Sequence, residues 1–205
     1  RGSGDPALVF VHGWGINGSF FNHQIDAFDD SFTVIVMDLG GHGRSGHNRA
    51  TWGISSYAAD VNAVLEAAQV QRAIVFGHSM GGTIIASAAA AKPGRAIGLV
   101  GIDTYQDFRE QYPREQVDEF LKPFRLNFDS TVGEFAWMML PKTTDTSIAN
   151  RIINEFRKGD SAALIETLDS LLANDASSIY ASLTIPVRAI SADTYPTHVD
   201  SNRTL

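Results

Sequence analysis

Residues 77–81 read Gly-His-Ser-Met-Gly, and their spacing suits nucleophilic chemistry. A β-branched and aromatic run, 72–76, precedes them, and a small-residue run with helix-forming composition, 83–91, follows them. A serine on so sharp a turn adopts a sparsely populated backbone conformation, and the tiny residues on either side let strand and helix approach closely. The pattern predicts that Ser79 is an exposed nucleophile. The five residues without their flanks are equally typical of an ordinary strand-to-helix turn.

Alternating patterns over the first hundred residues position this turn. Apolar, β-branched runs predict buried strands, and apolar residues at helical spacing predict the helices between them. Such alternation is typical of a parallel sheet with helices on both faces. The sequence therefore predicts an α/β fold with a mostly parallel central sheet. The predicted strands are 7–11, 33–37, 72–76 and 97–102, and the predicted helices are 19–28 and 57–68.

The character of the sequence changes between 104 and 184, where apolar stripes recur at helical spacing without a strand pattern. Pro123 lies inside the first stripe and should kink that helix or end it early. The strand pattern returns at 186–190. We therefore expect a core formed by 1–103 and 185–205, with 104–184 inserted as a helical lid. The stripes are Val117, Phe120, Leu121 and Phe124, then Ile148, Ile152, Ile153 and Phe156, then Leu164, Leu168, Leu171 and Leu172.

Length and composition restrict the class of protein. The 205 residues can bury one sizeable core, and 44% hydrophobic with 19% charged residues is a globular composition. A net charge of −7 without clustered Lys or Arg argues against nucleic acid as the main partner. No membrane span is expected, because the longest apolar run is far short of the roughly 18 to 20 residues required. Cysteine is absent, which excludes disulfides and thiolate chemistry. This fits a cytoplasmic location, and it suits an oxidising compartment as well.

Four separate motifs occur in a fixed order along the chain. His-Gly-Trp-Gly at 12–15 follows the first predicted strand, 38–45 follow the second, the serine turn follows the third, and Asp193 ends the last. In this combination the chain resembles the α/β-hydrolase fold family, in particular its lidded branch of esterases, lipases and carbon–carbon bond hydrolases. The resemblance covers nearly the whole chain. It implies hydrolysis by a Ser-His-Asp triad with no cofactor and no metal.

The resemblance also implies roles for individual residues. The backbone N–H groups of Trp14 and Met80 would form the oxyanion hole beside Ser79. Asp193 would fix the tautomer of the catalytic histidine and stabilise the imidazolium. Asp103 is the second candidate for this acid, because in some relatives the carboxylate follows the preceding strand. A simple strand-ending turn at 12–15, and a turn-forming role for Asp193, are the alternatives.

None of the six histidines fits the position that the resemblance requires, which lies well beyond Asp193. His12 and His78 belong to the loop and turn motifs, where we expect structural hydrogen bonds. His198 follows Asp193 by only five residues, which leaves no room for the helix and strand that the family places between acid and base. We therefore expect the chain to be incomplete at both ends, with the catalytic histidine beyond Leu205.

A second glycine pattern, G-x-G-x-x-G at 41–46, follows a predicted strand and by itself suggests a dinucleotide-binding oxidoreductase. That fingerprint opens a helix at once, so that the helix N-terminus meets the pyrophosphate. Residues 47–53 have loop composition instead, which argues against nucleotide binding. His42 and His47 have no third ligand at a suitable spacing, so we expect no metal site there.

The predicted lid is rich in apolar side chains, and Phe124, Trp137 and Met138 are candidates to line a pocket over Ser79. Packing within the lid is the simpler role for any one of them. Together they imply a substrate with an apolar acyl or aromatic group, because small-molecule sites are lined mainly by hydrophobic side chains.

We therefore expect a serine hydrolase that cleaves an ester, or a related carbonyl compound, of a small hydrophobic molecule through an acyl-enzyme. Two alternatives use the same fold: a receptor-type protein that binds its ligand with little turnover, and a cofactor-free perhydrolase. An intact Ser79 favours an enzyme, because a binding protein has no chemical need for a nucleophile. The sequence leaves the oligomeric state open.

Overall fold

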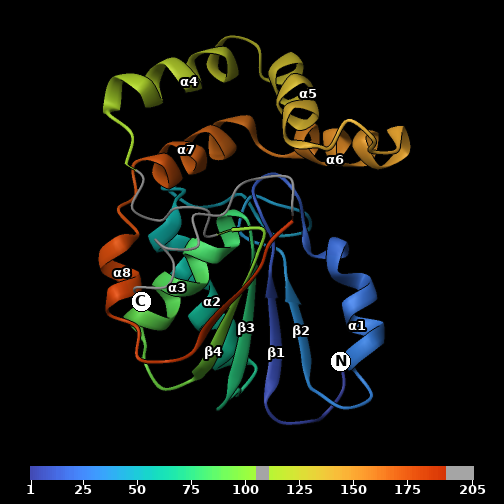
Figure 1. Ribbon diagram of the computed structural model, residues 1–205, viewed down its shortest axis with the longest axis vertical. Coiled ribbons are helices and arrows are strands. Elements are labelled where there is room, and N and C mark those ends of the chain that lie inside the picture. Colours follow the sequence, from blue (N-terminus) through green and yellow to red (C-terminus); the bar gives the residue numbers. More distant parts are fainter. Residues whose placement is uncertain (105–110, 193–205) are drawn as a thin grey trace.

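A computed structural model describes residues 1–104 and 111–192. Within these residues one sheet of five strands has the order β2-β1-β3-β4-β5, and every neighbouring pair is parallel (Figure 1). The predicted parallel sheet is thereby confirmed. The strands are β1 (Ala7–Val11), β2 (Val34–Met37), β3 (Ala73–His78), β4 (Ala96–Ile102) and β5 (Val187–Ile190).

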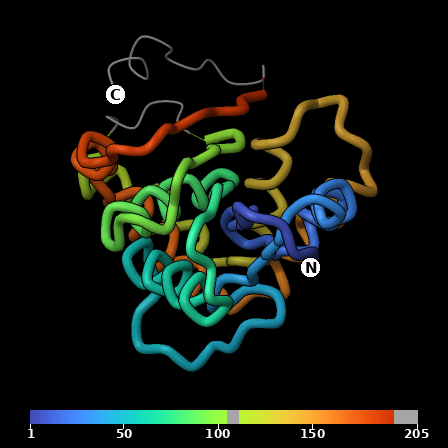
Figure 2. The backbone as a smooth tube through the Cα atoms, turned by 90° about the horizontal axis from the view of Figure 1, so that it is seen from below, coloured from blue at the N-terminus to red at the C-terminus, as the bar shows by residue number. Residues whose placement is uncertain are grey.

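Helices cover both faces of this sheet, as predicted (Figures 1 and 2). The 3₁₀ helix η1 (Gly18–Phe21) and α1 (Asn22–Phe28) pack on one face, and α2 (Ile54–Ala67) and α3 (Met80–Ala91) pack on the other. A buried hydrogen bond ties α2 to α3, because the Asn62 side-chain amide donates to the Ala88 carbonyl at 3.0 Å. No helix among the described residues is long and apolar enough to cross a lipid bilayer.

Strand β1 shows why a continuous apolar run is required at the centre of such a sheet. All of its residues are buried, because both of its faces are covered. Val9 and Val11 belong to the core under α2 and α3, whereas Leu8 and Phe10 belong to the smaller core on the α1 face. The Phe10 ring stacks on Phe76 of β3 with 4.6 Å between ring centroids. A shift of register by one residue would exchange the two sets of side chains.

Between 111 and 192 the described chain is helical up to β5. In Figure 1 the helices α4 to α7, here called the lid helices, lie beyond the strand ends that lead into the serine turn, and α8 lies beside α3. All three predicted stripes fall on helices. The bounds are α4 (Arg114–Leu126), α5 (Phe128–Met139), α6 (Thr146–Lys158), α7 (Ser161–Leu172) and α8 (Ser177–Ala181).

Of the two outcomes that the sequence predicted for Pro123, an early end of the helix does not occur, since α4 continues to Leu126. A kink at Pro123 stays a prediction. A proline removes only its own N–H from the helical ladder, and the turn that follows it can still form. Here the Asn127 N–H donates to the Pro123 carbonyl at 2.9 Å and closes that last turn. Asn127 then begins the next helix, because its side-chain oxygen accepts from the Ser130 N–H.

Two leucine-to-alanine substitutions test the described packing. Leu99 in β4 is 1% exposed, whereas Leu126 at the end of α4 is 79% exposed. We expect Leu99→Ala to lower the free energy of unfolding by about 2 to 5 kcal/mol, because it leaves a cavity in the core. Leu126→Ala should stay within about 0.5 kcal/mol of the parent protein. Urea denaturation measures both, and equal losses would contradict the assigned burial.

Candidate active site

Ser79 lies on the turn between β3 and α3 and its side chain is exposed. Its backbone has φ 51° and ψ −121°, a conformation that residues other than glycine rarely adopt. The turn is held on both sides, since the Ser79 N–H donates to the Ile102 carbonyl at 3.0 Å and the Gly82 N–H donates to the Ser79 carbonyl at 2.9 Å. The strained turn and the exposed hydroxyl that the sequence predicted are both present.

The glycines around Ser79 are required by crowding between backbones. A Cβ atom on Gly77 would collide with the backbone at Gly81. A Cβ atom on Gly81 would lie 2.6 Å from the Val11 carbonyl oxygen and 2.9 Å from that of His12. Because backbone atoms cannot move aside as a flexible side chain can, α3 starts this close to the end of β3 only with glycine at 77, and this close to the end of β1 only with glycine at 81.

This close approach brings loop 12–15 beside the serine. A Cβ atom on Gly13 would lie 3.2 Å from the Ser79 Cβ, so the two residues are immediate neighbours. Met80 is buried at the start of α3, where the first N–H groups of a helix have no partner within the helix. Within residues 1–104 and 111–192, neither the Met80 N–H nor the Trp14 N–H donates a hydrogen bond. Both donors can therefore bind an oxygen atom of a ligand.

His12 fixes loop 12–15 to the neighbouring strand. Its Nε2 accepts from the Leu39 N–H at 2.9 Å, so its Nδ1 carries the proton and donates to the Gly13 carbonyl at 2.8 Å. Burial, reinforced by the nearby His42, lowers the pKa of His12 from its ordinary 6.5 to about 3. The imidazole is therefore neutral and fully hydrogen-bonded, which confirms the structural role expected for His12.

Asp38 organises the loop in which the second glycine pattern lies. Its two carboxylate oxygens accept from the Gly18 N–H at 2.8 Å and the Arg44 N–H at 2.9 Å. Burial alone would raise the pKa of Asp38, but these hydrogen bonds outweigh it and the pKa is lowered. The Ser45 hydroxyl donates to the Asp38 carbonyl at 2.7 Å. Residues 41–46 thus fold back on Asp38 and open no helix, as their sequence context indicated.

Two more histidines lie near the serine turn, and burial lowers the pKa of each. His42 is buried and its Nδ1 donates to the Gly40 carbonyl at 3.0 Å. For His78, the negative charge of Asp103 acts in the opposite direction and raises the pKa, but burial has the larger effect. In contrast to the expectation for His78, its ring makes no hydrogen bond with the described part of the chain. The Gly13 Cβ position would lie only 2.8 Å from its Nδ1, so the ring packs against loop 12–15 instead.

Of the two candidate acids, Asp103 lies within the described residues and Asp193 does not. Asp103 follows β4 with a positive φ of 47°, and its N–H donates to the Ile190 carbonyl at 2.7 Å. Its carboxylate accepts from the Ala192 N–H at 3.4 Å, which ties the end of β4 to the segment after β5. Asp193 and His198 lie outside the described residues. Asp193 therefore stays a prediction from the sequence.

The indole ring of Trp14 lies among phenylalanine rings that come from three lid helices. Ring centroids lie 5.0 Å away for Phe156 of α6, 5.7 Å for Phe135 of α5 and 5.9 Å for Phe124 of α4. Phe128, at the start of α5, lies 6.4 Å away. The lid helices therefore share one aromatic cluster with the loop that borders Ser79.

The structure places the three predicted pocket residues differently. Phe124 is 3% exposed and packs inside this aromatic cluster. Trp137 is 43% exposed and Met138 is 67% exposed, both on the surface of α5. As residues that line a substrate pocket, all three stay predictions.

Helix α7 is attached to the core by polar contacts that the sequence did not predict. The contacts recur along one side of the helix, where the polar residues lie between the apolar positions of the predicted stripe. The hydrogen bonds are Trp14 Nε1–H to the Leu164 carbonyl at 2.8 Å, Trp52 N–H to Glu166 Oε1 at 2.8 Å, Tyr57 hydroxyl with Thr167 Oγ1 at 2.9 Å, and Ile54 N–H to Ser170 Oγ at 3.1 Å. Thr167 is fully buried. The only signal in the sequence for these contacts was the presence of polar residues next to the apolar positions of the helix.

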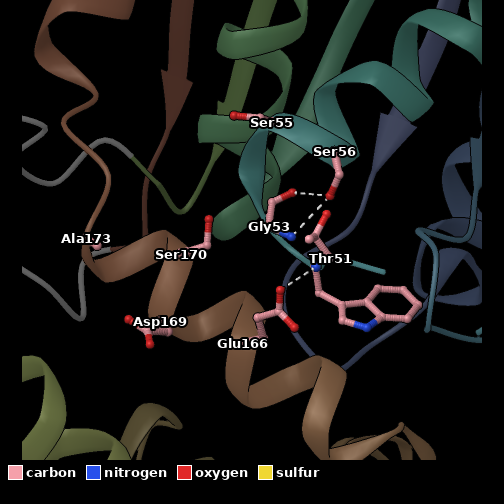
Figure 3. Close-up of a pocket in the computed structure, with 9 residues that line it drawn as sticks. Thr51, Gly53, Ser55, Ser56, Glu166, Asp169, Ser170 and Ala173 are labelled. Atoms are coloured by element: carbon pink, nitrogen blue, oxygen red, sulfur yellow. Dashed lines mark hydrogen bonds between the residues drawn. The ribbon is translucent and has the colours of Figure 1, made fainter. Parts of the chain in front are cut away.

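A hollow of about 350 Å³ lies between α7 and the start of α2 (Figure 3). Figure 3 shows Glu166 of α7 in a hydrogen bond with a backbone N–H before α2, and Ser56 in hydrogen bonds with Gly53. Six of its nine lining residues carry a hydroxyl or a carboxylate group, and neither Ser79 nor its neighbours contribute to it. The lining residues are Thr51, Trp52, Gly53, Ser55, Ser56, Glu166, Asp169, Ser170 and Ala173.

The lowered pKa of His12 predicts a pH dependence of stability. The unfolded chain binds a proton at His12 below about pH 6.5, whereas the folded chain does so only near pH 3. Stability is therefore complete above pH 6.5 and falls as the pH is lowered toward 3, by up to about 1.4 kcal/mol per pH unit from this group. His12→Asn should be less stable at pH 7, because the Leu39 N–H loses its acceptor, but should lose less on acidification. Urea denaturation between pH 7 and pH 4 measures both slopes, and equal slopes would contradict the role of His12.

Comparison with known proteins agrees with this geometry. The sequence profile of the alpha/beta hydrolase fold matches residues 6–181. A pimeloyl-[acyl-carrier protein] methyl ester esterase of Yersinia enterocolitica is 28% identical over 194 residues, which cover 90% of this chain and 73% of that protein. A serine hydrolase-like protein of Danio rerio is 35% identical over 104 residues, which cover 50% of this chain and 32% of that protein.

Solved structures show the same fold. A hydrolase from Oleispira antarctica superposes with a TM-score of 0.86 at 19% identity, over 96% of this chain and 76% of that one. The family profile and the relatives, rather than this likeness, support a hydrolase. The chain belongs to the alpha/beta hydrolase fold family.

Proposed function

We propose that the protein is a serine hydrolase that cleaves an ester of a small hydrophobic molecule. The observation that carries the proposal is the position of Ser79, which is exposed on a strained turn directly beside loop 12–15. A strained residue at a functional position is typical of a site whose geometry must be fixed in advance. The two unpartnered N–H groups beside it, from Trp14 and Met80, support an oxyanion hole.

The reaction would proceed in two acyl-transfer steps. Ser79 Oγ attacks the ester carbonyl carbon while its proton passes to a histidine that comes later in the chain than Asp193. The carbonyl oxygen becomes an oxyanion, to which Trp14 and Met80 donate, and the alcohol leaves with the proton from the histidine. Water then attacks the acyl-enzyme by the same route and restores Ser79. Asp193 holds the histidine in the required tautomer throughout.

Two features support the proposed substrate class. The relative from Yersinia enterocolitica is named for the hydrolysis of a methyl ester, and an ester carbonyl is the group that the proposed donors would polarise. Residues 104–184 would act as a lid, and the aromatic cluster of the described lid helices makes the surroundings of loop 12–15 apolar. An apolar acyl or aromatic group suits such surroundings.

A receptor-type protein on the same fold is the alternative from another class. The exposure of Ser79 favours the hydrolase, because ligand binding alone requires no hydroxyl on a strained turn. A perhydrolase would use the same residues with hydrogen peroxide in place of water. Short acyl esters, assayed with and without peroxide, separate the two enzyme activities.

Covalent labelling tests the proposed nucleophile. We expect a fluorophosphonate probe to label the full-length protein at Ser79, because its phosphorus atom is attacked as an ester carbonyl carbon is. Ser79→Ala should abolish labelling, and intact-protein mass spectrometry measures both. Tight binding of a small apolar ligand by a protein that does not react with the probe would instead establish the receptor.

A pair of aspartate substitutions tests the proposed acid. Asp193→Asn should lower kcat by about 10⁴-fold, because an amide in this place favours the wrong histidine tautomer. Asp103→Asn is the matched control and should cost less than about tenfold, because asparagine tolerates the positive φ found at this position. Steady-state hydrolysis of p-nitrophenyl butyrate measures both. A larger loss for Asp103→Asn would transfer the role to Asp103.

A further inference from the structure

Trp14 occupies two environments at once. Its backbone belongs to loop 12–15, where the preceding residue, Gly13, is an immediate neighbour of Ser79. The residue is 7% exposed, and its side chain packs against rings of the lid helices. The lid helices and the loop beside the nucleophile therefore meet in a single residue.

The side chain is fixed in position by both packing and hydrogen bonding. The indole Nε1–H donates to the Leu164 carbonyl in α7 at 2.8 Å, in a buried contact between residues 150 positions apart in sequence. The rings of Phe124 and Phe135 meet the indole nearly edge to face, with interplanar angles of 88° and 86°. Such arrangements are the ones that aromatic pairs prefer.

The backbone next to Trp14 leaves little room for an alternative arrangement. Gly15 has φ 70°, and a Cβ atom there would lie 2.5 Å from the Phe156 ring. On the other side, Gly13 is enclosed by His78 and Ser79. The peptide that carries the Trp14 N–H therefore lies in a narrow space between the serine turn and α6, where a shift of the indole cannot be absorbed by empty volume.

Helix α7 is a firm support for this contact. Hydrogen bonds of Glu166, Thr167 and Ser170, all within the same two turns as Leu164, join it to the first turn of α2 and to Trp52, two residues before that helix. The position of the Leu164 carbonyl relative to the core is therefore set independently of Trp14. The indole N–H that donates to this carbonyl is therefore positioned by α7 as a whole.

We propose that Trp14 is a positioning residue that couples the lid to the oxyanion hole: the hydrogen bond from its indole to α7 holds its own backbone N–H in place beside Ser79. The inference rests on the proposed hydrolase function. It adds that stabilisation of the oxyanion depends on how the lid helices pack around Trp14. Loss of the indole hydrogen bond lets the indole shift, and the adjoining peptide then moves slightly from its position beside Ser79. Substrate binding by apolar contacts is affected much less, so the loss appears in kcat more than in KM.

Replacement of Trp14 by 3-benzothienylalanine tests this coupling in the full-length protein. The analogue keeps the size and shape of the indole but has sulfur in place of the N–H group. Tyr57→Phe is the matched control, because it removes another buried hydrogen bond between the core and α7, at 2.9 Å, without touching loop 12–15. Both replacements should lower the melting temperature.

We expect the Trp14 analogue to lower kcat for p-nitrophenyl butyrate and the rate of fluorophosphonate labelling by about 10- to 100-fold, because small misplacements of catalytic groups have effects of this size. Its KM should change less than about threefold, whereas Tyr57→Phe should keep both rates within about twofold. Parent-like rates in the analogue, or equal losses in Tyr57→Phe, would overturn the coupling while labelling of the parent protein upholds the hydrolase. Absence of labelling in the parent protein at Ser79 would overturn the hydrolase, and the coupling with it.

Discussion

The approach of α3 to the end of β1 is the contact on which the candidate site depends. A Cβ atom at Gly81 would stand 2.6 Å from the Val11 carbonyl oxygen, so the helix can start where it does only because no side chain intervenes. This approach places the first N–H groups of α3 and the loop after β1 on either side of Ser79. The strained conformation of Ser79 follows from the same crowding, and buried parallel strands on both sides keep it from relaxing.

The polar side chains around this contact form hydrogen bonds with backbone groups. His12 is neutral and joins the ends of β1 and β2, and Asp38 gathers the loop after β2 with both carboxylate oxygens. Burial of such groups is tolerated because each of their polar atoms has a partner. They hold loop 12–15 from the side of the core, while the Trp14 indole fixes it from the side of the lid helices. The loop is thereby positioned from two directions before any ligand arrives.

The lid helices differ in how they are attached to the core. Helix α7 is joined to the core by hydrogen bonds along two turns, whereas α4 and α5 meet loop 12–15 through aromatic rings. Exposed ion pairs of Arg114 and Arg125 with Asp169 link α4 to α7, and such surface pairs contribute little stability in water. Hydrophobic packing, of which the rings around Trp14 are a part, therefore contributes more to the attachment of α4 and α5 than these ion pairs do.

The sequence by itself determined the alternation of strands and helices, the parallel sheet and the strained turn at Ser79, because these depend on local periodicity and on glycines two residues either side of the serine. The early helix end that it offered at Pro123 as one of two outcomes was wrong, because the backbone hydrogen bond from Asn127 closes a last turn after the proline. Only the tertiary structure decided that Trp14 lies among the lid phenylalanines, and that Glu166, Thr167 and Ser170 bind the core. Those contacts join residues more than a hundred positions apart, and neither spacing nor composition encodes which distant partner a side chain meets once the chain is packed.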